Sequence, residues 1–324
     1  MKSAPASTIE KERMMAPGPS GPSATSGEGR GWSRADRKHL FIWVLVGFAA
    51  PAPLMFAMEK TLRPSGPTIT VQSEFMTKAI AAFFVLLATW IVSRLERRPL
   101  GDYGIPARRA FGMRFWEGTV WGFAMLSAVL LVIHLLSHYQ IDSVAVHGRI
   151  AAAYGAGWAL VFLAVAIGEE FAFRGYWLFL MSKSLRFWPS AVILSGVFVL
   201  AHVTNRGETA LGLLQVFAAG LLFCFTVRRT GNLWFAVGFH AAWDWAQTFF
   251  YGTADSGLVG AGRLLNSRLQ GPNWLSGGSV GPEGSVAAVF VLLLCAMLVH
   301  FRFPRVNYAD RPLRSSFDDH GGVA

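Results

Sequence analysis

Three clusters of polar side chains interrupt the apolar runs in the second half of this chain, and their residue types could carry acid–base chemistry. The first is the stretch GEEFAFRG, which holds Glu169, Glu170 and Arg174. On a helix, Glu170 and Arg174 form an i,i+4 pair in the favourable order, with the glutamate nearer the N-terminus, whereas Glu169 is rotated away from the arginine. One carboxylate then has a counter-ion and the other is free. Two carboxylates in different environments are what acid–base catalysis uses.

The other two clusters each place two side chains on one helix face. In SGVFVLAHVTN, Phe198 lies four residues before His202, and in GFHAAWDWAQTFF, His240 lies four residues before Asp244. A charge in the middle of a bilayer costs ~2.5–3.5 kcal/mol on insertion scales, so it persists where it is paired, solvated or functional. Taken singly, the clusters also fit a structural ion pair, an interfacial histidine and an internal His–Asp hydrogen bond. Their concentration in one part of the chain favours a shared site.

The apolar runs around these clusters predict a membrane protein. The chain of 324 residues is 53% hydrophobic and 15% charged, whereas soluble domains are about 25% charged. We expect an all-α fold with about eight transmembrane helices, each of about 20 residues, around a polar intramembrane cavity. The helices are predicted near residues 39–58, 75–95, 116–137, 155–181, 189–204, 211–228, 232–250 and 285–303. The fourth is too long for one straight crossing, so we expect it to extend past the bilayer or to bend.

The basic residues predict the orientation in the membrane. With the N-terminus in the cytoplasm, 21 Lys and Arg fall on cytoplasmic segments, seven on the opposite side and Arg174 inside a helix, which accounts for all 29. This asymmetry predicts cytoplasmic N- and C-termini, in an integral protein of the plasma (inner) membrane. Topology and anionic lipid headgroups explain the net charge of +10, and we expect no nucleic acid partner.

Composition divides the chain into six parts. They are a disordered N-terminal tail (1–36), transmembrane helices one to three (37–150), a core of helices four to seven that carries the three polar clusters (151–252), an extracytoplasmic loop (253–284), a last transmembrane helix (285–303) and a cytoplasmic tail (304–324). The Gly-rich loop is typical of a flexible connection. Glu74 and Lys78 are interpreted as a boundary pair at the start of the second helix. Cys224 and Cys295, both inside apolar runs, are interpreted as buried small hydrophobic residues.

The order EExxxR, FxxxH and HxxxD on successive membrane helices resembles the intramembrane glutamic endopeptidases of the CPBP family, which are related to the type II CAAX prenyl endopeptidases and include bacteriocin-processing and immunity proteins. The resemblance covers roughly residues 155–250. It implies that Glu169 activates a water as general base, that His202 holds and polarises this water, and that His240 and Asp244 stabilise the oxyanion. Glu170 and Arg174 would brace the site, with Phe198 in support. Many members carry Asn where this chain has Asp244, and we favour a role for Asp244 as an acceptor that orients His240.

These observations together predict an endopeptidase that cleaves a membrane-associated peptide or protein, either prenylated or of the bacteriocin or leader type, with no cofactor. A zinc enzyme is the alternative, with Glu169, His202 and His240 as three ligands and a water as the fourth. Two further alternatives are a non-proteolytic scaffold or immunity protein of the same family and a proton-coupled transporter, because chains of buried Glu, His and Asp also mark transporters.

Overall fold

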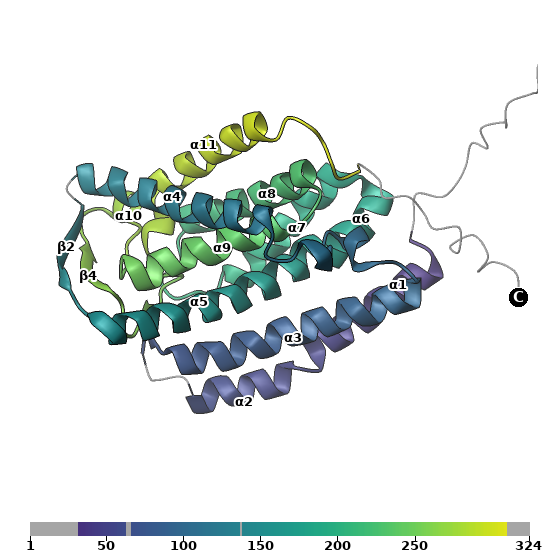
Figure 1. The fold of residues 1–324 in the computed structure, drawn as a ribbon, viewed down its shortest axis with the longest axis horizontal. Helices are drawn as coiled ribbons and strands as arrows, with labels where there is room; N and C mark the ends of the chain where they lie inside the picture. The colour runs from purple at the N-terminus through teal and green to yellow at the C-terminus, as the bar shows by residue number, and fades with distance from the viewer. Residues whose placement is uncertain (1–31, 63–65, 137, 310–324) are drawn as a thin grey trace, which may run out of the picture. The chain divides into compact units, whose positions relative to one another are not determined.

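Helices form most of the part of the chain that the structure describes (Figure 1). The computed structural model describes residues 32–62, 66–136 and 138–309. Most of the predicted N-terminal tail and most of the predicted C-terminal tail lie outside the described residues. The first helix begins at Arg34, two residues before the predicted end of that tail, and its N-terminus is capped by Ser33, whose side chain accepts from the backbone N–H of Asp36.

Each of the eight segments predicted to be helical contains helix in the structure, and the first, 39–58, is divided by a turn at Ala50 and Pro51. The helices are α1 (Arg34–Val44), α2 (Ala52–Leu62), α3 (Val71–Glu96), α4 (Met113–Leu135), α5 (Gly148–Glu170), α6 (Trp177–Leu185), α7 (Phe187–His202), α8 (Ala210–Thr230), α9 (Trp234–Trp245), α10 (Asn273–Ser276) and α11 (Val286–Arg302). Short 3₁₀ turns, η2 (Leu100–Tyr103), η3 (Ala107–Arg109) and η6 (Pro282–Gly284), lie in the loops.

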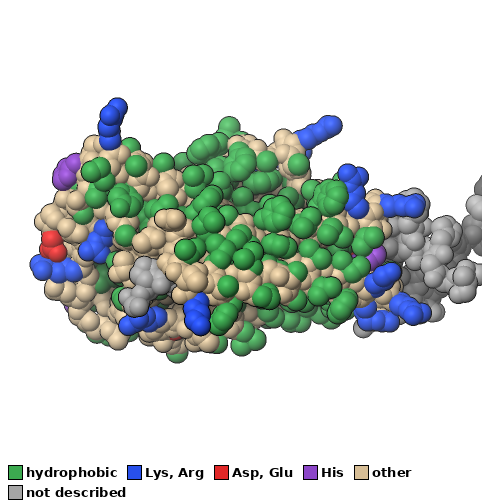
Figure 2. Space-filling view, turned by 90° about the horizontal axis from the view of Figure 1, so that it is seen from below, with side chains coloured by type: hydrophobic (Ala, Val, Ile, Leu, Met, Phe, Trp, Pro, Cys, Tyr) green, Lys and Arg blue, Asp and Glu red, His purple; other side chains and the backbone are tan. Residues whose placement is uncertain are grey.

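Five helical stretches are long and apolar enough to cross a bilayer. They are Arg34–Leu62, Val71–Glu96, Met113–Leu135, Gly148–Leu185 and Ala210–Thr230, and α7 and α11 are shorter apolar helices. Large apolar side chains such as Phe83, Trp90 and Val120 are exposed on the outside of the bundle. Figure 2 shows such side chains over the middle of one face, with Lys and Arg towards its ends. The chain is therefore an all-α polytopic membrane protein, as predicted.

Wider, π-helical turns interrupt three of the membrane helices. They are η1 (Leu45–Ala49), which follows α1, η4 (Phe171–Tyr176), which follows α5, and η5 (Ala246–Phe250), which follows α9. In η4 the backbone leaves the helical region at Gly175, with φ −86° and ψ −111°. The stretch Gly148–Leu185 is thus longer than the predicted fourth helix and also bends, at Gly175, within a widened turn that begins directly after Glu170. Turns of this kind are frequent at functional sites.

Two small sheets join the loops at one end of the bundle. Strand β1 (Thr68–Ile69) pairs in parallel with β3 (Val259–Gly260), and β2 (Tyr139–Val144) pairs antiparallel with β4 (Leu265–Leu269). We call residues 253–284 the cap. Because the cap contains β3, β4 and α10, the prediction of a flexible connection was wrong for this segment. The two strand pairs give this segment backbone hydrogen bonds, which its Gly-rich composition did not predict.

Helix α9, which carries His240 and Asp244, packs against α4, α5 and α8. On the α4 side the contact is made by glycines. A Cβ atom at Gly118 or Gly122 would overlap the carbonyl oxygen of Phe235 or Phe239 in α9, respectively. Small residues let two membrane helices approach backbone to backbone. The α4–α9 contact therefore sets the position of the helix that carries two of the predicted site residues.

This packing predicts opposite outcomes for two Gly→Ala substitutions in helices. G122A should lower the free energy of unfolding by about 1–3 kcal/mol, because the new methyl group overpacks the α4–α9 contact. G196A in α7 should not destabilise the protein, since no atom beyond its chain neighbours and the backbone of its own helix lies within 4 Å of its Cβ position, and alanine favours the helix. Thermal unfolding in detergent, followed by tryptophan fluorescence, measures both. Equal stability of the two variants would contradict the assigned contact.

Candidate active site

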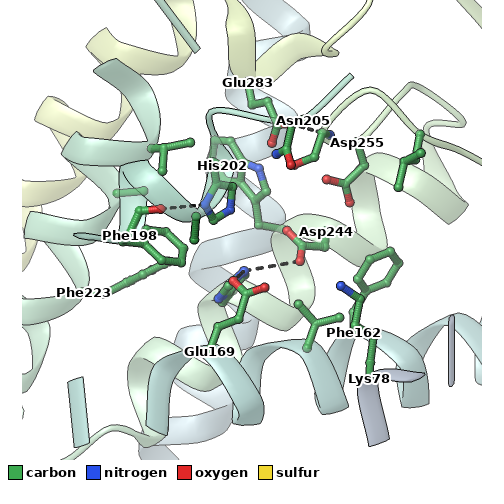
Figure 3. A pocket seen from close by; sticks show the side chains of 18 of the residues that line it. Lys78, Phe162, Glu169, Phe198, His202, Asn205, Phe223, Asp244, Asp255 and Glu283 are labelled. Atoms are coloured by element: carbon green, nitrogen blue, oxygen red, sulfur yellow. Dashed lines mark hydrogen bonds and ion pairs between the residues drawn. The ribbon is translucent and has the colours of Figure 1, made fainter. Parts of the chain in front are cut away.

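A cavity of about 440 Å³ lies between α3, α5, α7, α8 and α9, with the cap across one end (Figure 3). Five of the predicted site residues line it: Glu169 from α5, Phe198 and His202 from the second half of α7, and His240 and Asp244 from α9. Three clusters that are separated in the sequence therefore meet at one polar cavity inside the helix bundle. Arg174 and Glu170 lie behind the wall and do not line it.

His240 connects the carboxylates of the site. Its Nδ1 lies 2.9 Å from Oε1 of Glu170, while its Nε2 lies 3.4 Å from Oδ2 of Asp244 and 3.9 Å from Oε2 of Glu169. Its ring also stacks on Phe223, with 5.5 Å between the ring centroids. A carboxylate can only accept, so Nδ1 donates to Glu170. The imidazole is thereby fixed with Nε2 towards the cavity.

Glu170 and Arg174 form the predicted i,i+4 ion pair, at 3.1 Å between Oε1 and Nη1. The two side chains are 0% and 1% exposed, and the guanidinium lies 4.2 Å from the centre of the Phe198 ring. The additional hydrogen bond from His240 to the same Oε1 was not predicted, because it depends on how α9 is rotated against α5. Glu170 thus links the arginine to the histidine of the cavity.

The two adjacent glutamates occupy different environments, as the sequence indicated. The side chain of Glu169 is 29% exposed, whereas that of Glu170 is fully buried. His202 is held beside Phe198, whose backbone carbonyl oxygen lies 2.8 Å from Nδ1. Since a carbonyl oxygen can only accept, Nδ1 carries a proton and, in the neutral ring, Nε2 carries the lone pair. Glu169 and His202 therefore both offer proton acceptors on the cavity wall.

Sequence reasoning missed several residues that line the cavity. Lys78 and Glu74 were interpreted as a boundary pair, but both line the cavity from α3, and the described interactions contain no ion pair between them. The helix begins at Val71, four residues earlier than predicted, so both charges lie within its first turns and face α5. A lysine inside a predicted membrane helix was the signal that could have identified this position.

Two further carboxylates enter the cavity from the cap end. Asp255 accepts a hydrogen bond from Thr248 Oγ1 at 3.0 Å, and Glu283 accepts one from the backbone N–H of Ser256. Burial raises the pKa of both carboxyl groups above their ordinary values. No motif marks these residues, because they come from irregular loops that only the β1–β3 pairing and the turn η6 bring to the cavity.

The structure also bears on a metal site. Within residues 32–62, 66–136 and 138–309, no group of three or more His, Cys, Asp and Glu side chains is arranged to hold a metal ion. In the alternative set of Glu169, His202 and His240, the Nδ1 atom of His240 is bonded to Glu170 and its Nε2 already faces two carboxylates. Cys224 and Cys295 are buried and free, as predicted.

The buried ion pair predicts a large stability effect. R174M should lower the free energy of unfolding by about 3–5 kcal/mol, because it leaves the carboxylate of Glu170 buried without its counter-ion. R268M is the control, since the Arg268–Asp142 pair is about half exposed and such pairs contribute little. Denaturant unfolding of purified protein compares the two. Comparable losses would mean that the buried pair is not what stabilises this region.

Comparison with known proteins agrees with the geometry. Residues 151–246 match the family model described as type II CAAX prenyl endopeptidase Rce1-like. The matched range runs from the first turn of α5 to the start of η5 and contains all three clusters. Searches among curated proteins and among solved structures found no match. The segment that carries all three clusters is therefore similar to the type II CAAX prenyl endopeptidase Rce1-like family.

Proposed function

We propose that this membrane protein is an intramembrane endopeptidase in which Glu169 activates the attacking water. One observation carries the proposal: of two adjacent glutamates, one is buried in an ion pair and the other is 29% exposed on the wall of a polar cavity, 3.9 Å from a fixed histidine. A carboxylate in this position can take a proton from water. The family match supports a peptide bond as the target.

The first step of the proposed reaction uses Glu169 and His202. A water held between the Glu169 carboxylate and the unprotonated Nε2 of His202 loses a proton to Glu169 as its oxygen attacks the scissile carbonyl. The tetrahedral intermediate then collapses, and Glu169 returns the proton to the leaving amine. Proton transfer by one positioned group of this kind contributes about 10²–10⁴-fold in rate.

His240 supplies the electrostatic stabilisation. Its Nε2 faces the cavity between Asp244 and Glu169, and a proton on this nitrogen can donate to the developing oxyanion. Asp244, at 3.4 Å, accepts from the same nitrogen and holds the ring in line, while Glu170 holds it from the other side. This arrangement supports the acceptor role favoured for Asp244 over a role as a donor.

E169Q is expected to reduce peptide hydrolysis by at least about 100-fold, because an amide cannot act as the general base, and to leave stability unchanged. E74Q is the matched control, since Glu74 also lines the cavity but makes no described contact with His240, and it should change the rate by no more than a few-fold. Substrates are first identified by mass spectrometry of membrane peptides from cells with the wild-type protein or E169Q, and then assayed with purified protein.

Full activity of E169Q would refute the assignment of the base. If the peptide sets of the two cell lines are identical while the protein still confers its cellular effect, the scaffold or transport alternatives are favoured instead.

A second experiment separates the glutamic mechanism from zinc catalysis. After dialysis of the purified protein against a strong chelator, the rate of peptide cleavage should stay within experimental error of the untreated rate, because Glu169 and His240 act without a metal. Elemental analysis of the same samples measures zinc per chain. Loss of activity that added zinc restores would show that the metal alternative is correct.

A further inference from the structure

The two ends of the helix bundle carry different numbers of basic residues. Of the Lys and Arg in the described ranges, fifteen lie at the end where α1 begins and α3, α6, α8 and α11 end: three in the first turn and a half of α1, six between Arg94 and Arg114, and the pairs Lys183–Arg186, Arg228–Arg229 and Arg302–Arg305. Contacts across these segments hold this end together, for example Lys183 with Asp36 at 2.6 Å and Arg228 with the carbonyl of Tyr308 at 2.8 Å. We call it the basic end.

The opposite end, where the cap lies, has six Lys and Arg among the described residues. They are Lys60, Lys78, Arg149, Arg206, Arg263 and Arg268. Since Lys and Arg concentrate on the cytoplasmic side of membrane proteins, the ratio of fifteen to six places the basic end in the cytoplasm and the cap on the other side. The structure strengthens the sequence argument, because it shows that the counted segments really lie together.

The cavity belongs to the cap end. Every residue that lines it from outside a helix comes from loops joined at that end: Ile69, Asn205, Asp255, Ser256, Leu258 and Glu283. None comes from the loops of the basic end. His202, Asn205 and Asp255 are only partly buried, so the polar wall is accessible from this side.

Towards the basic end the cavity is closed. The Glu170–Arg174 pair lies behind its wall, and beyond it Tyr103, Tyr176 and Phe179 are all buried in one cluster with ring centroids 4.9–5.5 Å apart. Neither water nor a peptide can pass such a packed aromatic layer without opening it.

We infer that the cavity is reached from the extracytoplasmic side, and that the substrate is an exported or membrane-anchored polypeptide whose scissile bond lies at that face. The substrate class rests on the proposed endopeptidase function, whereas the sidedness does not. A peptide presented from the cytoplasm, including a C-terminal segment modified there, would meet the closed end of the site.

Cysteine accessibility in intact bacterial cells tests the sidedness. N205C places a thiol in the cavity, S143C in β2 marks the outside of the cap end, and A107C in η3 marks the basic end; the native Cys224 and Cys295 are fully buried and give the background. A membrane-impermeant maleimide should label N205C and S143C in intact cells, and A107C only after the membrane is permeabilised.

Labelling of A107C but not of N205C or S143C in intact cells would overturn the orientation. Labelling of S143C alone, with N205C unreactive before and after permeabilisation, would overturn access to the cavity from this side.

An activity experiment then separates the two proposals: one test peptide is anchored at either face of the membrane, with E169Q as the control. Cleavage only at the extracytoplasmic face is expected, and cleavage only at the cytoplasmic face overturns the inference. If labelling is as expected and neither peptide from a panel is cut, the proposed function fails while the sidedness stands.

Discussion

A guanidinium buried among apolar helices has to be matched by a carboxylate, and at Arg174 this requirement reaches across three helices. Glu170 supplies the charge from the preceding turn, Phe198 of α7 supplies a ring face, and Glu170 in turn accepts a hydrogen bond from His240 of α9. Removing one member leaves another polar group unpaired in a low-dielectric interior. These contacts therefore restrict how the three helices can be arranged, and that arrangement determines where the histidine meets the cavity.

The same helix α9 is fixed on its other side by backbone contact rather than by charge. Gly118 and Gly122 of α4 let the backbone of α9 approach closely, while His240 is tied to Glu170 on α5. Widened turns follow α5 and α9 directly after the site residues, in η4 and η5. A π-helical turn holds more residues than an α-helical turn, so the side chains after it point in other directions than they would in a regular α-helix. The buried face of each helix therefore changes direction at the cavity.

The sequence predicted the features that depend on local pattern. All eight helical segments and the Glu170–Arg174 pair were found because hydrophobic runs and i,i+4 spacing act within one helix. The contacts between helices could not be derived in the same way, because the bond from Glu170 to His240 depends on helix rotation. The length of the fourth helix indicated that it extends or bends, but it did not indicate that the backbone departs at Gly175. Asp255 and Glu283 were missed because irregular loops carry no periodicity, and Lys78 because the start of α3 was placed four residues too late.

The chemistry follows from how the protein divides two neighbouring glutamates. Exchanging their roles would require Glu170 to leave both Arg174 and His240 and to enter the cavity. The guanidinium of Arg174 would then be buried without a counter-ion. Glu169 does not neutralise a buried cation in this way. Its nearest described partner is Nε2 of His240 at 3.9 Å, a distance longer than a hydrogen bond. A carboxylate that is held near a histidine but not bonded to it has lone pairs free for water. The buried pair thus does more than brace the helix, because Arg174 and His240 both bind Oε1 of Glu170 and keep that glutamate out of the cavity. In the proposed mechanism this leaves Glu169 as the carboxylate that meets water.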